Sequence, residues 1–347
     1  MKIGLVGCGV AVKHQVPGIC SFPGTEIVSI CDINEGKLNE FGEKFNIQNR
    51  YTELIEMLEH QQPEVVHIMT PPKTHASLAV QAIDMGCHVL VEKPMAITTK
   101  EADQMIEAAE RNKVKLCVMH NHSFDPHILK AKKLFAQGVV GDILHVESRY
   151  CLDKEKMLKE GLSHSEHWAY QLPLGIFGEY TPHLIYLFLC FLGNVKSVQV
   201  LRKRLNNSSL DSIHGISVEV DAEKGMGHLL MLDNMNYGHF SVHIYGTKLA
   251  LHMNMMDLTM TVEKERNLPK TAARMFSTME QGFQNIMGNI SNSAKIVTGK
   301  LKRRPGHRML IKKFYESIQN NAEPPVTGQG GKEVVRVLEM IKDGLEN

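Results

Sequence analysis

The sequence predicts an α/β protein of two domains, a doubly wound parallel sheet over residues 1–121 and an α+β domain over 122–347. A length of 347 residues suits two domains of ordinary size. Up to about residue 120, short strands rich in Val and Ile alternate with amphipathic helices, which is typical of a parallel sheet with both faces covered. Beyond about residue 125, apolar and polar residues alternate with a period of two, which indicates an antiparallel sheet with one covered face.

The elements of the first domain follow from this alternation. A helix over 78–86 ends at Gly86, since glycine commonly closes helices. A second helix begins after Thr98, which stands three residues before Glu101 in the spacing of a capping box. We expect strands at 2–6, 26–31, 64–69, 88–91 and 115–119.

The second domain contains strands first and helices last. Its expected strands are 142–150, 197–205, 215–220 and the long stretch 237–264, which turns at 245–247. Helical periodicity returns at 308–321 and 331–344. We assign no element to 266–306, which is rich in Met, Asn and Lys.

Composition excludes several classes of partner. The net charge of +1 gives no electrostatic reason to expect nucleic acid. The longest apolar run, Leu184–Leu192, is too short for a membrane helix, and the N-terminus lacks the layout of a signal peptide. The seven cysteines have no zinc-site spacing, so we expect no metal and a reducing compartment. We therefore predict a cytoplasmic protein that binds neither membranes nor nucleic acid.

A glycine-rich turn follows the first strand. Gly7 permits the tight turn, and Gly9 lets backbone approach a pyrophosphate at the start of the next helix, at Val10 and Ala11. Asp32 ends the second strand, 23 residues past Gly9, near the usual spacing of the acid that binds the adenosine ribose. Its carboxylate would repel a 2′-phosphate, so NAD is favoured over NADP. The alternative is an ordinary strand–helix turn with a solvated aspartate, because the third fingerprint position holds a valine.

The segment Thr70–His75 closes the strand at 64–69, at the sheet edge where open α/β folds bind ligands. We assign Thr70, Pro71, Pro72 and His75 to the cofactor site. For His75 a structural role is the alternative, because a single loop histidine has no defined chemistry.

The stretch "TPPKTHASLAVQAIDMGCHVLVEKP" resembles the glucose–fructose oxidoreductase, inositol dehydrogenase and MocA family (Gfo/Idh/MocA). The resemblance implies a Rossmann domain followed by an α+β domain with a large, mostly antiparallel open sheet. It also implies NAD(P)-dependent oxidation or reduction of a secondary alcohol on a sugar, cyclitol or sugar nucleotide. The family's open sheet often joins subunits, which implies a homodimer or homotetramer.

The resemblance also assigns catalytic residues. Lys93 is placed near the nicotinamide and the reacting hydroxyl, and Glu92 helps to seat the nicotinamide. The second signature contains Gly175, then Glu179 where the family has aspartate, then His183. A histidine suits general acid/base work near neutral pH, and a lysine ammonium stabilises a developing alkoxide.

We therefore expect His183 as the base, Lys93 as electrostatic stabiliser and Glu179 as orienting acid, with Pro182 in the first turn of a helix capped by Thr181. A buried structural histidine and a surface lysine are the alternatives. Asn121 is assigned to the cofactor site, whereas His122 and Arg149, near the expected domain junction, receive no role.

Two further motifs and two further functions stay open. The loop at 163–168, with His164, Glu166 and His167, fits a substrate loop or a solvated one, and the basic run 300–308 fits a phosphate site or a solvated face. The alternatives to a dehydrogenase are a glycoside hydrolase that recycles its NAD and a non-catalytic NAD-sensing protein.

Overall fold

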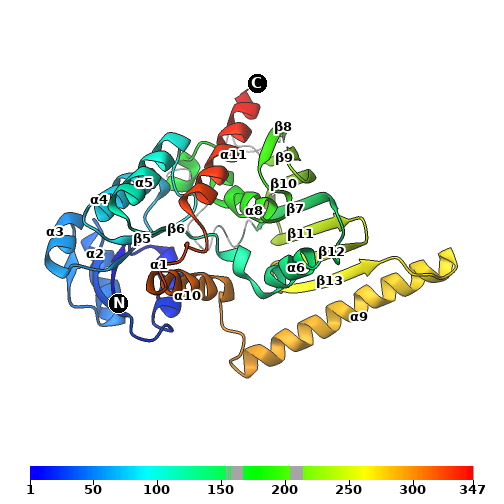
Figure 1. Ribbon diagram of the computed structural model, residues 1–347, viewed down its shortest axis with the longest axis horizontal. Coiled ribbons are helices and arrows are strands. Elements are labelled where there is room, and N and C mark those ends of the chain that lie inside the picture. Colours follow the sequence, from blue (N-terminus) through cyan, green and yellow to red (C-terminus); the bar gives the residue numbers. More distant parts are fainter. Residues whose placement is uncertain (154, 156, 158–166, 204–213, 347) are drawn as a thin grey trace. The chain divides into compact units, whose positions relative to one another are not determined.

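The computed structural model describes residues 1–153, 155, 157, 167–203 and 214–346 (Figure 1). The chain divides into two compact units. Unit 1 comprises Met1–Asn121 and Gly306–Arg336, and unit 2 comprises His122–Pro305 and Val337–Asn347. Unit 1 thus takes in a late segment that sequence analysis assigned to the second domain. No helix within the described ranges is long and apolar enough to cross a bilayer.

Unit 1 contains the predicted parallel sheet, in which the five expected strands are joined by the short strand β3, in the order β3-β2-β1-β4-β5-β6. Both faces of this sheet are apolar. Helices α3, α4 and α5 pack on one face, and helices α1 and α10 pack on the other. The strands are β1 (Lys2–Val6), β2 (Glu26–Cys31), β3 (Arg50–Tyr51), β4 (Val65–Ile68), β5 (His88–Val91) and β6 (Leu116–Val118). The helices are α1 (Val10–Ile19), α2 (Glu35–Phe45), α3 (Leu54–Gln61), α4 (His75–Asp84), α5 (Thr99–Asn112), α10 (Pro305–Gln319) and the start of α11 (Gly328–Glu346).

The capping box at the start of α5 is confirmed. The Thr98 hydroxyl accepts from the Glu101 N–H at 3.2 Å, and the Glu101 carboxylate accepts from the Thr98 N–H at 3.2 Å. Two of the unpaired N–H groups of the first helical turn are thereby satisfied.

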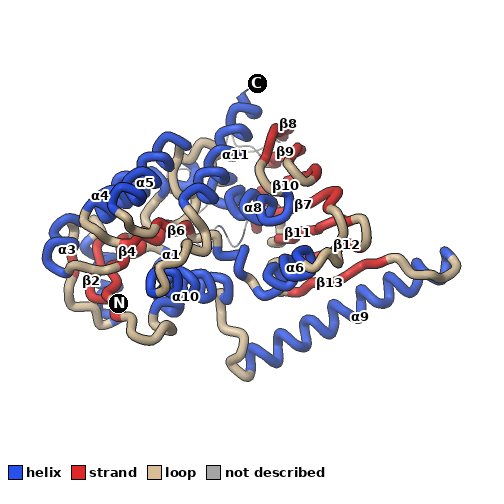
Figure 2. The backbone as a smooth tube through the Cα atoms, in the orientation of Figure 1, coloured by secondary structure: helices blue, strands red, loops and turns tan. Residues whose placement is uncertain are grey.

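Unit 2 contains a sheet of seven strands in the order β13-β12-β11-β7-β10-β9-β8, drawn red in Figure 2. All neighbours are antiparallel except β7 and β10, so the predicted class of sheet is confirmed. The strands are β7 (Ile143–Asp153), β8 (Val195–Lys203), β9 (Gly215–Ala222), β10 (Gly225–Met235), β11 (His239–Gly246), β12 (Leu249–Asn254) and β13 (Thr259–Lys264). The helices are α6 (Pro126–Ala136), α8 (Phe177–Leu192) and α9 (Lys270–Val297).

Helix α8 covers one face of this sheet through a close approach at Gly227. A Cβ atom added to Gly227 of β10 would lie 1.7 Å from the Phe188 ring, so only glycine leaves room for that ring. Sequence analysis assigned no strand to β10. The observed turn between β11 and β12 lies at Thr247 and Lys248, slightly later than expected.

The expected start of α8 is wrong. The helix begins at Phe177, so Pro182 lies inside it rather than in its first turn. Thr181 is buried and donates to the Phe177 carbonyl at 2.7 Å, so it is not the N-cap. Glu179 therefore lies in the first turn of the helix.

Candidate active site

The glycine turn of unit 1 has the backbone that the sequence predicts. Gly7 has φ +97°, and a Cβ atom there would lie 2.8 Å from the Met69 backbone, so the position requires glycine. At Gly9 an added Cβ atom would meet nothing within 4 Å, so the space beside the first turn of α1 is open. Val10 is 67% exposed. This open helix N-terminus presents free N–H groups, which suit a phosphate.

Asp32 joins this turn to the end of β2. Its carboxylate accepts from the Cys8 N–H at 2.6 Å and from the Asn34 N–H at 2.8 Å. Burial, together with the Asp32 charge, raises the pKa of Cys8 and of Cys31 to about 12, so both thiols stay protonated. Asp32 is therefore the charged group beside the turn.

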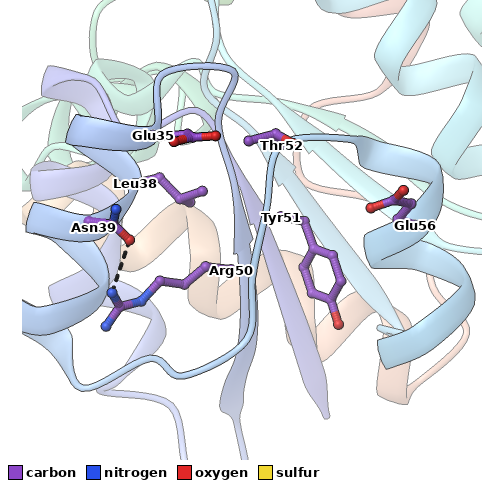
Figure 3. Close-up of a pocket in the computed structure, with 7 residues that line it drawn as sticks. All are labelled: Glu35, Leu38, Asn39, Arg50, Tyr51, Thr52 and Glu56. Carbon is purple, nitrogen blue, oxygen red and sulfur yellow. Dashed lines mark hydrogen bonds between the residues drawn. The ribbon is translucent and has the colours of Figure 1, made fainter.

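A pocket of about 270 Å³ is lined by residues of α2, β3 and α3 (Figure 3), including Tyr51, whose carbonyl accepts from the Asp32 N–H at 3.1 Å. Arg50 donates to Asn39 at 3.1 Å and to the Ile47 carbonyl at 3.0 Å, which engages its guanidinium within the protein. Two carboxylates remain on the lining, and these would repel a 2′-phosphate. The lining residues are Glu35, Leu38, Asn39, Arg50, Tyr51, Thr52 and Glu56.

His75 is fully buried and holds two loops together. Its ring nitrogens lie 2.7 Å from the Thr70 carbonyl and 2.9 Å from the Pro94 carbonyl. Burial lowers the pKa of His75 to about 4, which outweighs the two carbonyls that favour the charged form. The neutral ring carries one N–H, so it donates to one of these carbonyls and lies against the other, between the Thr70–Pro72 segment and Pro94.

A buried chain of hydrogen bonds ends beside Lys93, which is 8% exposed at the carboxyl end of β5. Gln15 donates to Glu92 at 2.6 Å, and Gln15 Oε1 lies 2.6 Å from His67 Nδ1. The other His67 nitrogen lies 2.8 Å from the Tyr315 hydroxyl.

The donors along this chain have one consistent order. Burial lowers the pKa of His67 to about 3, so the ring is neutral and carries one N–H. Because Gln15 donates its amide to Glu92, its oxygen accepts from His67 Nδ1–H, and His67 Nε2 accepts from Tyr315. Sequence analysis missed these three residues; the only signal was a histidine inside the apolar strand β4.

In unit 2, His183 lies on α8 and is held by Tyr186. The Tyr186 hydroxyl lies 2.7 Å from His183 Nδ1 and accepts from the His122 N–H at 3.2 Å. His122 in turn pairs with buried Asp125 at 2.7 Å, and its ring lies 5.0 Å from that of His183. The contact with Tyr186 therefore fixes the orientation of the His183 ring on α8.

Glu179 and His183 are four residues apart on α8 and therefore lie on the same face of the helix. Both are partly exposed. Gly175, at φ +56°, precedes the helix. A helix capped by Thr181, as the sequence predicts, would have left Glu179 ahead of the helix; the observed start at Phe177 places it inside.

The remaining candidate residues from the sequence lie on different elements of the structure. Asn121 is buried at the start of the short 3₁₀ helix η2 (Asn121–Phe124). Arg149 of β7 donates to Glu147 at 2.9 Å, and His167 accepts from the Ala169 N–H at 3.3 Å. His164 and Glu166 lie outside the described residues. Within the described part of the chain, no group of three suitable side chains could hold a metal ion.

The fold and the glycine turn of unit 1 define a dinucleotide-binding protein. Residues 1–120 match the oxidoreductase family with an NAD-binding Rossmann fold, and residues 128–252 match the GFO/IDH/MocA C-terminal domain. The chain belongs to the Gfo/Idh/MocA family of NAD-binding oxidoreductases.

Two relatives in sequence carry different names. Oxidoreductase P35 of Formosa agariphila is 28% identical over 217 residues, which is 61% of this chain and 67% of that protein. Glycosyl hydrolase family 109 protein 1 of Shewanella sp. strain ANA-3 is 28% identical over 169 residues, 46% of this chain. That match spans only 37% of the hydrolase.

Solved structures share the whole fold. The WlbA dehydrogenase of Bordetella pertussis, in complex with NADH and UDP-GlcNAcA, has a TM-score of 0.81 at 20% identity, covering 100% of this chain and 95% of that one. Levoglucosan dehydrogenase in complex with NADH and levoglucosan has a TM-score of 0.79 at 18% identity, covering 100% and 96%.

Proposed function

We propose that the protein transfers a hydride between the nicotinamide of NAD and a secondary alcohol of a sugar, cyclitol or sugar nucleotide. The observation that carries this proposal is buried Lys93 beside Glu92, whose carboxylate is held by the chain from Gln15 to Tyr315. Glu92 and Lys93 lie at the same edge of the sheet as the glycine turn. A rigidly held carboxylate beside a buried lysine suits a reacting alcohol. The sugar ligands named for the two dehydrogenase structures support the substrate class.

The residues of unit 1 fit NAD by their chemistry. The open N-terminus of α1 suits the pyrophosphate, and Asp32 suits the ribose hydroxyls. NAD, when bound, supplies the hydride acceptor or donor. We assign cofactor contacts to Gly7, Gly9, Val10, Ala11, Asp32, Thr70, Pro71, Pro72, Glu92, Lys93 and Asn121, with His75 holding the loop.

His183 is proposed to remove the hydroxyl proton on oxidation and to return it on reduction. The Tyr186 hydroxyl, 2.7 Å from His183 Nδ1, orients the imidazole for this exchange. Lys93 stabilises the alkoxide by charge, and Glu179 orients the imidazole from one helical turn away. The glutamate replaces the aspartate that the family pattern has here, which lengthens the acid by one methylene.

The test is a panel of sugars, inositols and nucleotide sugars with NAD and NADP, read at the absorbance of reduced nicotinamide. On the best substrate, Lys93→Met and His183→Asn should each lower kcat by roughly 10²- to 10⁴-fold. Turnover near wild type in either variant would refute that residue's role. A panel without any response would favour a non-catalytic NAD-binding protein.

A glycoside hydrolase that recycles its NAD is the second candidate, favoured by the family 109 relative. Because the match spans 37% of that protein, the likeness leaves most of the hydrolase uncompared. Cleavage of a nitrophenyl glycoside without net release of NADH would establish this activity. Stoichiometric NADH formation from a free sugar would exclude it as the main reaction.

We further propose that unit 1 is the cofactor domain and that unit 2 binds substrate and joins subunits in a homodimer or homotetramer. The seven cysteines, all free, are consistent with the proposed cytoplasmic location.

A further inference from the structure

Helix α9 presents its polar side to its own sheet. The Gln284 amide accepts from the Val262 N–H at 2.7 Å and donates to the Val262 carbonyl at 3.0 Å, on the end strand β13. Asn292 donates to the Asp257 carbonyl at 2.9 Å and to the Leu258 carbonyl at 3.1 Å. These bonds fix the rotation of the helix, which runs beside β13 in Figure 1.

The opposite side of α9 is apolar and exposed. Seven large side chains form this side, here called the α9 stripe, and each is between 46% and 68% exposed. A globular protein ordinarily buries the apolar face of a helix and exposes the polar one, and α9 does the reverse. The stripe consists of Met275, Phe276, Met279, Phe283, Ile286, Met287 and Ile290.

The spacing within the stripe suits a second helix. Its centre follows positions 276, 279, 283, 286 and 290, which are alternately three and four residues apart. That repeat is the seam of paired helices, in which side chains of one helix insert between those of another. A stripe of this kind is complementary to itself when a second copy is related by a two-fold axis.

The area of the stripe agrees with a stable dimer. At about 200 Å² for a large apolar side chain, the exposed fractions amount to roughly 800 Å² of surface per copy. A standard protein–protein interface buries about 800 Å² on each partner.

The placement of α9 favours a protein partner over a lipid surface. A helix that lies on a membrane has Lys and Arg on its polar side, which faces headgroups and water. The polar side of α9 is instead bonded to the sheet of its own unit. Here Lys270, Arg274 and Lys295 stand eighteen residues, or five full turns, from Gly288, Asn292 and Ser277. They therefore share the sheet-facing side of the helix, and the stripe itself carries no charge.

We propose that the α9 stripe is a homodimer interface, in which two copies of the protein pair along α9. Each stripe therefore packs against the Phe, Met and Ile side chains of the same stripe in the second copy. The interface does not depend on the proposed catalytic activity, because it involves no residue assigned to the site.

The molar mass of the full-length protein tests this proposal, measured by sedimentation velocity and light scattering. The double variant Phe283→Glu/Ile286→Glu should halve the mass of the wild-type species, with an unchanged helical spectrum. The matched control Thr278→Glu/Asn285→Glu adds the same two charges to exposed positions of α9 outside the stripe and should keep the wild-type mass. The uncharged variant Phe283→Ser should raise the dissociation constant at least tenfold.

Three results would overturn the proposal. These are a monomeric wild type, an unchanged mass of the stripe variant, and dissociation of the control to the same extent. A lipid surface is the other possible partner, and it is tested by binding of the protein to vesicles of phosphatidylcholine with phosphatidylserine. Stripe-dependent binding of a monomeric protein to these vesicles would assign the stripe to a lipid surface instead.

Discussion

The neutral state of His67 predicts how unit 1 loses stability in acid. His67 is fully buried between Gln15 and Tyr315, and burial lowers its pKa from 6.5 to about 3. The unfolded chain binds a proton at this residue below pH 6.5, whereas the folded chain does so only near pH 3. The contribution of neutral His67 to the stability of unit 1 is therefore fully present above pH 6.5, and it is lost as the pH falls from 6.5 to 3.

The size of the effect follows from these two pKa values. Between pH 7 and pH 5, protonation of the unfolded chain at His67 alone should lower the free energy of unfolding by about 2 kcal/mol. His67→Gln removes the titrating group. The variant should be less stable at pH 7, but its stability should fall by about 2 kcal/mol less than that of the wild type over this interval.

Hydrogen exchange of peptides that cover β4 measures the opening of unit 1 without interference from unit 2. The exchange rates at pH 7 and pH 5 are corrected for the intrinsic pH dependence of amide exchange. His60→Gln, which replaces an exposed histidine of unit 1, is the matched control. An equal loss of stability in the wild type and His67→Gln would refute a neutral His67 and the donor order derived from it.

Three further changes test other parts of the structure. Tyr186→Phe removes the hydroxyl that holds His183 and should lower kcat about tenfold at unchanged KM for NAD, because orientation rather than cofactor binding is lost. Asp32→Ala should raise KM for NAD by about 10- to 100-fold and reduce the preference for NAD over NADP. Gly227→Ala forces a methyl group into the Phe188 ring and should destabilise unit 2 by about 1–3 kcal/mol in urea unfolding.

Matched variants separate these effects from general damage. Tyr237→Phe removes an exposed hydroxyl and should keep kcat. Gly282→Ala adds a methyl group where nothing lies within 4 Å and should not destabilise unit 2. A Tyr186→Phe enzyme with wild-type kcat, an Asp32→Ala enzyme with unchanged cofactor preference, or a Gly227→Ala protein of wild-type stability would contradict the respective argument.

Sequence analysis succeeded where one local pattern determines the structure. The positive φ of Gly7 agrees with the tight turn expected where a glycine pair follows a strand and precedes a helix. The capping box of Thr98 and Glu101 is likewise a contact within one helical turn. Such features require no knowledge of the rest of the chain.

The errors arise where tertiary contacts override local preference. Pro182 normally disfavours a helix interior, yet α8 continues through it because its apolar side chains pack on the sheet of unit 2. The chain from Gln15 through His67 to Tyr315 joins residues 52 and 248 positions apart, which no spacing rule connects. Helix α9, by contrast, was missed although positions 276–290 have the three-and-four spacing of an amphipathic helix, which is a local signal.

The Gln284 side chain has a consequence for solubility. A primary amide offers the same donor and acceptor as a peptide group, so at Val262 the helix takes the place of an eighth strand. Open strand edges invite pairing with other chains and hence aggregation. By occupying the N–H and carbonyl of Val262, Gln284 protects this end of the sheet from the edge-to-edge addition that begins amyloid-like assembly.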